Sequence, residues 1–127
     1  MFNIHDFCTH ANGELLSQDN NLFTEIIKWT KHPDFFVRRA AAVILIYPIR
    51  RHKFQNINPF LISEALLHDD HHLVLKGYGW MLKVLSETEH IKVYEYLKWK
   101  KQIMPRVAFR YALEKLDKEL KLELMGG

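Results

Sequence analysis

Three segments of this chain follow one pattern at intervals of roughly 35 to 37 residues. Each segment has a cation, one or more small residues within the next two positions and then a large apolar residue, and the three cations are Arg39, Lys76 and Arg110. Small side chains let neighbouring helices approach closely, and helix pairs stacked in this way form an α-solenoid. The pattern therefore predicts an all-α fold in which one basic residue per repeat lies on a common surface.

Helical periodicity extends over almost the whole sequence, and no segment alternates as a strand or hairpin does. Asp34 is expected to cap a helix that runs to Tyr47, where Pro48 stops it. Asn58 followed by a proline opens another helix, and Asp70 is expected to cap the next one. The expected helices, about seven in all, cover residues 6–16, 20–30, 34–47, 58–67, 71–86, 88–99 and 105–124. Taken in pairs, they predict a short α-solenoid of HEAT-like helical pairs in a single domain over residues 1–127.

The expected helix around Lys76 has an unusual composition. Gly77 and Gly79 each cost a helix about 1 kcal/mol relative to alanine, which is tolerable where another backbone or a ligand must approach closely. Lys76, Trp80 and Lys83 are spaced i, i+4 and i+7, so they share one helical face. A cation, an indole and a second cation in a row suit contact with a phosphate backbone and with an aromatic or cationic base.

Further basic residues extend this face into a candidate DNA-binding surface, because guanidinium and ammonium groups neutralise backbone phosphates. The candidates are Arg38, Arg39, Lys76, Lys83, Arg106 and Arg110, with residues 50–53 as a basic loop. The alternative is that these residues form ordinary solvated helix faces, since Glu114, Asp117 and Glu119 are interleaved with them.

Composition sets broad limits on the class of protein. The formal charge of +3 and the pI near 9.0 permit an anionic partner without demanding one. The longest apolar run, residues 40–47, is too short to span a bilayer, and the first residues lack the pattern of a signal peptide. Cys8 is the only cysteine, so no intramolecular disulfide can form. A cytoplasmic protein without a membrane segment is expected.

Several of these segments together resemble a known family. Residues 36–43, 76–83 and 104–115, with Asp6-Phe7-Cys8-Thr9 near the start, are similar to the DNA alkylation repair glycosylases of the AlkD-like HEAT-repeat class. The resemblance covers essentially the whole chain, but only about the C-terminal half of a complete family member. It implies that the chain is the C-terminal part of a longer family fold, and that a homo-oligomer could cover the face left by the earlier repeats.

The resemblance also implies a reaction. Its expected partner is double-stranded DNA with purines alkylated at N3 or N7, whose N-glycosidic bond is hydrolysed without metal or cofactor. Asp6 takes the role of the catalytic carboxylate, which stabilises positive charge on the sugar and holds the attacking water. Trp80 takes the aromatic role by a cation–π contact with the base. Arg39, and less directly Arg38, would contact a phosphate beside the lesion.

One departure from the family keeps the enzymatic interpretation open. Family members have Asn-Trp before the catalytic aspartate, where this chain has Met1 and Phe2, and phenylalanine offers a weaker cation–π surface. The chain is therefore either an active alkylpurine glycosylase or an inactive HEAT-like module that binds DNA or a protein. A purely protein-binding helical scaffold is the third alternative.

Two further patterns have simpler interpretations. Residues 68–72 read His-Asp-Asp-His-His, but three of them fall in an expected turn, and adjacent histidines in a helix point to different faces. Capping and surface solvation are therefore expected here rather than metal binding. Trp29 and Trp99 lie near the ends of first helices and are expected to pack between repeats.

Overall fold

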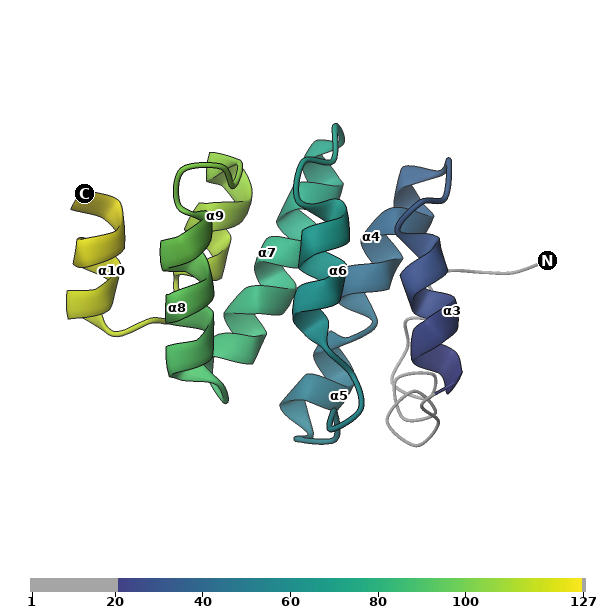
Figure 1. Ribbon diagram of the computed structural model, residues 1–127, viewed down its shortest axis with the longest axis horizontal. Coiled ribbons are helices and arrows are strands. Elements are labelled where there is room, and N and C mark those ends of the chain that lie inside the picture. Colours follow the sequence, from purple (N-terminus) through teal and green to yellow (C-terminus); the bar gives the residue numbers. More distant parts are fainter. Residues whose placement is uncertain (1–20, 127) are drawn as a thin grey trace.

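The computed structural model describes residues 21–126, and every regular element among them is a helix (Figure 1). The helices are α3 (Asn21–Trp29), α4 (Phe35–Val43), α5 (Ile46–Arg50), α6 (Pro59–Leu66), α7 (His72–Ser86), α8 (His90–Lys100), α9 (Arg106–Ala112) and α10 (Lys118–Gly126). No helix in this part of the chain is both long and apolar enough to cross a membrane. The expected helix over residues 6–16 lies outside the described residues.

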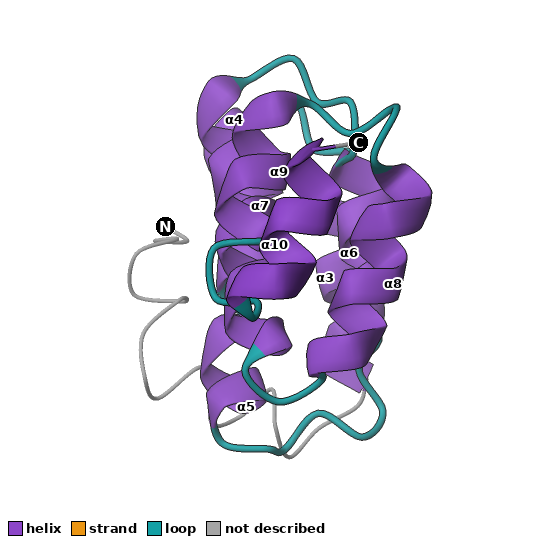
Figure 2. Ribbon diagram, turned by 90° about the vertical axis from the view of Figure 1, so that its left-hand side faces the viewer, coloured by secondary structure: helices purple, strands orange, loops and turns teal. Residues whose placement is uncertain are grey.

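The helices form two layers (Figure 2). One layer contains the first helix of each pair, α3, α6 and α8, and the other contains the second helices, α4, α7 and α9. The second helices begin at Phe35, His72 and Arg106, close to the predicted repeat interval. Helix α10 follows at the C-terminal end and packs against α8. The predicted all-α architecture, a short solenoid of helical pairs, is confirmed.

The helix expected over residues 34–47 is shorter than predicted. Asp34 does cap it, since its carboxylate accepts a hydrogen bond from the Phe36 backbone N–H at 2.9 Å, but α4 ends at Val43. A turn at residues 44–45 leads into α5, and Pro48 lies inside α5 instead of ending a helix. Proline is tolerated there because the first turn of a helix needs no bond from its N–H groups. Residues 44–46 and 49, which lie on either side of the start of α5, are all buried in the core.

The helix expected over residues 105–124 is divided as well. Helix α9 ends at Ala112, and Leu113 and Leu116 in the connection that follows are both buried in the core. Helix α10 then lies beside α8, where the Tyr94 hydroxyl donates a hydrogen bond to Glu123 at 2.8 Å. A continuous helix would have carried α10 away from this contact.

The caps of α6 and α7 show one success and one error of prediction. Asn58 caps α6 as expected, and its side-chain oxygen accepts from the Phe60 N–H at 3.1 Å. The cap of α7 is His71 rather than Asp70, because the His71 Nδ1 accepts from the Leu73 N–H at 3.1 Å. Asp70 is exposed and lies 3.6 Å from the Arg38 guanidinium.

Helix α7 is the centre of the solenoid and packs between α4 and α9. Its buried side includes Val74, Tyr78, Met81 and Leu82, none of which is exposed to solvent. The Tyr78 hydroxyl donates a hydrogen bond to the Leu67 carbonyl oxygen at 2.8 Å, which satisfies the only polar atom of that side chain. Burial raises the pKa of Tyr78, so this hydroxyl keeps its proton.

The second glycine of α7 sets the distance between α7 and α9. A Cβ atom at Gly79 would lie 2.9 Å from the Ala108 carbonyl oxygen and 2.9 Å from the Tyr111 Cβ. Both distances are below van der Waals contact, so only glycine allows α9 to approach this closely. The close approach inferred from the glycine pair is therefore a backbone contact at position 79.

A polar cluster joins the first helices α6 and α8. Lys100 and Tyr96 donate hydrogen bonds to the two carboxylate oxygens of Glu64, at 2.7 Å and 2.5 Å, and the Ser63 hydroxyl lies 2.7 Å from that of Tyr96. Burial raises the pKa of Glu64, but the hydrogen bonds from Lys100 and Tyr96 outweigh burial, and the pKa lies below the ordinary value of 4.5. The ionised carboxylate is thus part of the folded structure.

We expect the stability contributed by Glu64 to depend on pH. Because its pKa is lower in the folded state, the contribution is present above the ordinary carboxyl pKa and is lost as the pH falls through the folded value. Urea unfolding of the wild type and of Glu64→Gln should therefore differ most near neutral pH, and the difference should be smaller at an acidic pH below the ordinary carboxyl value. An equal difference at both pH values would contradict this account.

Candidate nucleic-acid interface

The second helices enclose an open hollow of about 230 Å³ on their side of the solenoid. Helix α4 contributes one lining residue, α9 contributes another and α7 contributes four. The lining residues are Arg39, Leu73, Lys76, Trp80, Lys83 and Tyr111. The predicted row of Lys76, Trp80 and Lys83 thus lies on one face of α7, and this face opens into the hollow.

Arg39 enters the hollow across the first glycine of α7. A Cβ atom at Gly77 would lie 3.1 Å from the Arg39 Cγ, so the absence of a side chain makes room for the arginine. One guanidinium N–H of Arg39 donates to the Leu73 carbonyl oxygen at 2.6 Å. This bond holds the side chain in place, and the other N–H groups stay available for a ligand. The two glycines of α7 therefore have separate roles. Gly77 makes room for the Arg39 side chain, and Gly79 allows α9 to pack closely against α7.

The two lysines of the hollow differ in their partners. The Lys83 ammonium lies 3.5 Å from a Glu114 carboxylate oxygen and 5.7 Å from the centre of the Tyr111 ring. Such an exposed ion pair is weak and can exchange for another anion. Lys76 forms no hydrogen bond or ion pair with any described residue. Lys76 is consequently the cation that is most available to an incoming ligand.

Trp80 lies between these cations. It is partly buried and packs against the hydrophobic core, and its remaining surface lines the hollow. An indole anchored in this way keeps a fixed orientation, which suits stacking against a flat or apolar group. The arrangement combines a rigid aromatic surface with three positive charges.

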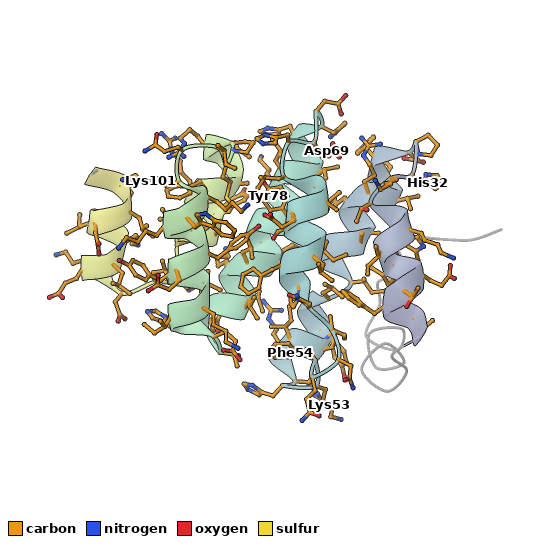
Figure 3. The ribbon with its side chains drawn as sticks, viewed as in Figure 1. His32, Lys53, Phe54, Asp69, Tyr78 and Lys101 are labelled. Carbon is orange, nitrogen blue, oxygen red and sulfur yellow. The ribbon has the colours of Figure 1, made fainter. Side chains whose placement is uncertain are left out.

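The remaining predicted DNA-binding residues lie elsewhere. Arg110 is exposed on α9 but does not line the hollow. Arg38 lies at the edge where α3 joins α4 and α6 joins α7, and Figure 3 shows Asp69 and His32 at this edge. The Arg38 guanidinium donates to both Asp69 oxygens, at 2.8 Å and 3.3 Å, and to the His32 and Pro33 carbonyl oxygens. Its hydrogen-bonding groups are occupied within the protein.

Arg106 has a similar structural position, and Asp6 lies outside the described residues. The Arg106 guanidinium donates to the carbonyl oxygens of Lys101 and Met104 and lies 4.3 Å from the centre of the Phe109 ring. It thereby ties the α8–α9 connection to α9. Of the six predicted basic residues, the structure brings together Arg39, Lys76 and Lys83.

Sequence reasoning missed Tyr111 as part of the hollow. The aligned repeats have a small residue directly after the cation in two cases, Ala40 and Gly77, whereas the third has a tyrosine. The tyrosine at this position was the sequence signal that could have identified Tyr111 as part of the hollow. The tyrosine fits because Gly79 leaves room for its Cβ.

The electrostatics of the hollow favour an anion. Three cations line it and no acidic residue does, and the Glu114 carboxylate pairs with one of these cations, Lys83. Charges of one sign in a concave site raise the local concentration of oppositely charged ligands. No group of three or more histidine, cysteine or acidic residues that could hold a metal ion occurs within residues 21–126.

Comparison with known families places this geometry in context. The family described as DNA alkylation repair enzyme matches residues 3–116. The chain belongs to this family. The match includes Asp6 and all residues that line the hollow, and it ends before α10. Neither the curated proteins nor the solved structures include a significant match to the chain. Membership of this DNA alkylation repair family supports a role in DNA alkylation repair.

Proposed function

We propose that this family member binds duplex DNA along the layer of second helices, with successive backbone phosphates at the hollow beside an alkylated purine. The observation that carries the proposal is the convergence of Arg39, Lys76 and Lys83 around Trp80. Phosphate contacts of this kind supply affinity that is independent of base sequence. Arg110 extends the basic surface along α9.

The charge of the hollow favours a phosphate there over the alkylated base. A purine alkylated at N3 or N7 is cationic, and like charges within a few ångströms repel one another. Backbone phosphates at the hollow reverse this situation, because together they neutralise Arg39 and Lys76 and attract the cationic base toward their own side. The Trp80 indole can then stabilise the base by a cation–π contact, worth about 0.5 to 2 kcal/mol.

The reaction that fits this placement is hydrolysis of the N-glycosidic bond. The bond between C1′ and the purine nitrogen breaks, and its electron pair leaves with the alkylated base, which thereby loses its positive charge. Water adds to C1′ and releases a proton. Asp6 would stabilise the positive charge that develops on the sugar and orient the water.

An inactive DNA-binding module is the second candidate function. The observation that favours it is Phe2, which stands where the resemblance predicts a tryptophan. Phenylalanine is a weaker partner for a cationic base. Under this alternative the hollow would still bind the backbone, but no base would be released.

Base release from duplex DNA that contains N7-methylguanine separates the two functions. With protein in saturating excess, we expect the wild type to release the modified base and Asp6→Asn to lose this activity by at least about 100-fold, with duplex affinity unchanged. Trp80→Ala should reduce the rate of release by less. DNA binding without any base release would establish the inactive module and contradict the glycosylase.

The ion pair between Lys83 and Glu114 provides a further prediction. Because Glu114 competes with phosphate for Lys83, Glu114→Gln is expected to tighten duplex binding by about two- to fivefold at low salt. Fluorescence anisotropy with a labelled duplex measures this change. The matched control is Glu119→Gln, an exposed position on α10, because it removes the same charge away from the hollow. Equal gains in both variants would mean that only net charge matters.

A further inference from the structure

A row of apolar side chains runs beside the row of cations on the second helices. In each repeat an apolar residue stands three positions before the cation, so the two share one helical face. The three apolar residues are Phe36 on α4, Leu73 on α7 and Val107 on α9. Phe36 is the only aromatic residue of the row and has the largest exposed fraction, 49%.

Phe36 is the outer ring of a stack of three. Its ring centre lies 4.4 Å from that of Phe35, which packs against the core, and the Phe35 ring centre lies 3.6 Å from that of His71. At these distances two rings cannot share one face of Phe35, so Phe36 and His71 lie on its opposite faces. Within residues 21–126, Phe36 has no further ring contact. One face of Phe36 is therefore fixed against Phe35, and the other is free.

The free face of Phe36 suits a base that has left the duplex. An apolar side chain that wedges between base pairs contacts bases with both of its faces, whereas one face of Phe36 is covered by Phe35. Bases inside an intact duplex have both faces covered by their neighbours and offer none to Phe36. A displaced base has a free π-face, and stacking on an aromatic side chain stabilises it whatever its identity.

The charges around Phe36 favour a base there over a phosphate. The exposed Asp34 carboxylate accepts a hydrogen bond from the Phe36 N–H at 2.9 Å. Asp69 and the exposed Asp70 pair with Arg38, so three carboxylates surround one guanidinium at this edge. A phosphate is repelled here and attracted to the cations one helical turn further along.

We propose that Phe36 is a stacking site for a nucleobase displaced from the duplex, while Arg39 binds a phosphate of the same strand. This site rests on the proposed binding of duplex DNA to the second helices and adds a base contact to it. Side chains three positions apart on a helix have Cβ atoms about 5 to 6 Å apart, a distance that one nucleotide can bridge between its phosphate and its base. Stacking on Phe36 would partly offset the contacts that the base loses when it leaves the duplex.

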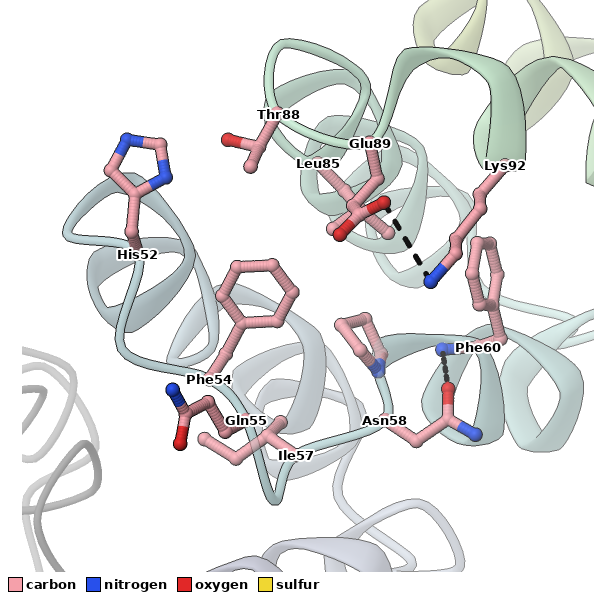
Figure 4. Close-up of a pocket in the computed structure, with 11 residues that line it drawn as sticks. His52, Phe54, Gln55, Ile57, Asn58, Phe60, Leu85, Thr88, Glu89 and Lys92 are labelled. Atoms are coloured by element: carbon pink, nitrogen blue, oxygen red, sulfur yellow. Dashed lines mark hydrogen bonds and ion pairs between the residues drawn. The ribbon is translucent and has the colours of Figure 1, made fainter.

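The larger cavity of about 630 Å³, where α5 connects to α6 and α7 connects to α8, is a poorer site for such a base (Figure 4). Among the described residues that line it, Lys92 is the only lysine or arginine, and its ammonium lies 3.7 Å from the carboxylate of Glu89. The cavity shares no lining residue with the hollow between the second helices. A base held there would not be next to the row of cations, as a base on Phe36 would be.

Three labelled duplexes that differ at one nucleotide test the site. One is fully paired, the second has a single unpaired adenine, and the third has an abasic tetrahydrofuran residue in place of that adenine. The second and third have the same extra backbone unit, so only the base distinguishes them. By fluorescence anisotropy, the wild type should bind the duplex with the adenine about five- to tenfold more tightly than the abasic one.

Variants locate the preference for the adenine at Phe36. Phe36→Leu keeps an apolar side chain against Phe35 and removes the aromatic face, so the preference should fall below about twofold. Its affinity for the paired duplex, the salt dependence of that affinity and its thermal midpoint should stay close to those of the wild type. Phe36→Trp should retain the preference. Trp99→Ala is the control, because it removes an exposed aromatic ring from the first-helix layer and should leave the preference unchanged.

The outcomes separate this site from the proposed function. A wild type that binds none of the three duplexes would overturn the proposed function and the stacking site with it. Salt-dependent duplex binding without a preference for the adenine would overturn the stacking site alone. The same conclusion would follow if Phe36→Leu kept the preference, or if Trp99→Ala lost it to the same extent.

Discussion

Replacing Gly79 with alanine is expected to lower the free energy of unfolding by about 1 to 3 kcal/mol, although alanine is the better helix former by about 1 kcal/mol. The new Cβ would lie 2.9 Å from the Ala108 carbonyl oxygen and from the Tyr111 Cβ. The first is a backbone atom and the second is joined directly to the backbone, so α9 as a whole must move away from α7. Thermal unfolding should show a midpoint lower by roughly 4 to 12 °C.

Gly77→Ala is the matched control, because it makes the same change two residues earlier in the same helix. Its Cβ would meet the Arg39 Cγ at 3.1 Å, and a flexible side chain can shift where a backbone cannot. We expect unchanged or increased stability, together with weaker DNA binding because Arg39 is displaced from the hollow. Equal destabilisation by both substitutions would contradict the separate roles of the two glycines.

The second large effect concerns DNA affinity. Arg39→Ala combined with Lys76→Ala is expected to weaken duplex binding by roughly 10- to 100-fold at low salt, because two phosphate contacts are lost. Neither side chain is part of the hydrophobic core, so the thermal midpoint should stay close to that of the wild type. Fluorescence anisotropy with labelled duplexes of unrelated sequence should show the same loss for each duplex.

The control for that experiment removes the same amount of charge elsewhere. Lys31→Ala combined with Lys118→Ala alters two exposed cations outside the hollow and should weaken binding only slightly. If both double variants lose affinity equally, the second-helix hollow is not the binding site.

Local sequence signals predicted the parts of the fold that depend on local chemistry. The caps at Asp34 and Asn58 involve a side chain and a backbone N–H two residues away, so the sequence alone suffices to find them. The shared face of Lys76, Trp80 and Lys83 follows from helical geometry in the same way. The repeat pattern extended this reasoning to Arg39, which enters the same hollow from α4.

The errors occur where tertiary packing decides the outcome. Pro48 should end a helix by propensity, but burial of the surrounding isoleucines and leucine places it in the first turn of α5. The division between α9 and α10 places α10 beside α8, a tertiary contact that no local signal indicates. Trp99 was expected to pack between repeats, yet it is 78% exposed, with the Lys100 ammonium 4.5 Å from its ring centre. The ion-pair partner of Arg38 lies 31 residues away at Asp69, a distance that only the fold closes.

The salt dependence of duplex DNA binding tests the central claim most directly. If Arg39, Lys76, Lys83 and Arg110 contact phosphates, the logarithm of the association constant should fall against the logarithm of the salt concentration with a slope of about −3 to −4. The slope should be smaller in magnitude by about 2 for Arg39→Ala with Lys76→Ala. Affinity that does not change with salt, or an unchanged slope in that variant, would contradict a DNA-binding surface on the second helices.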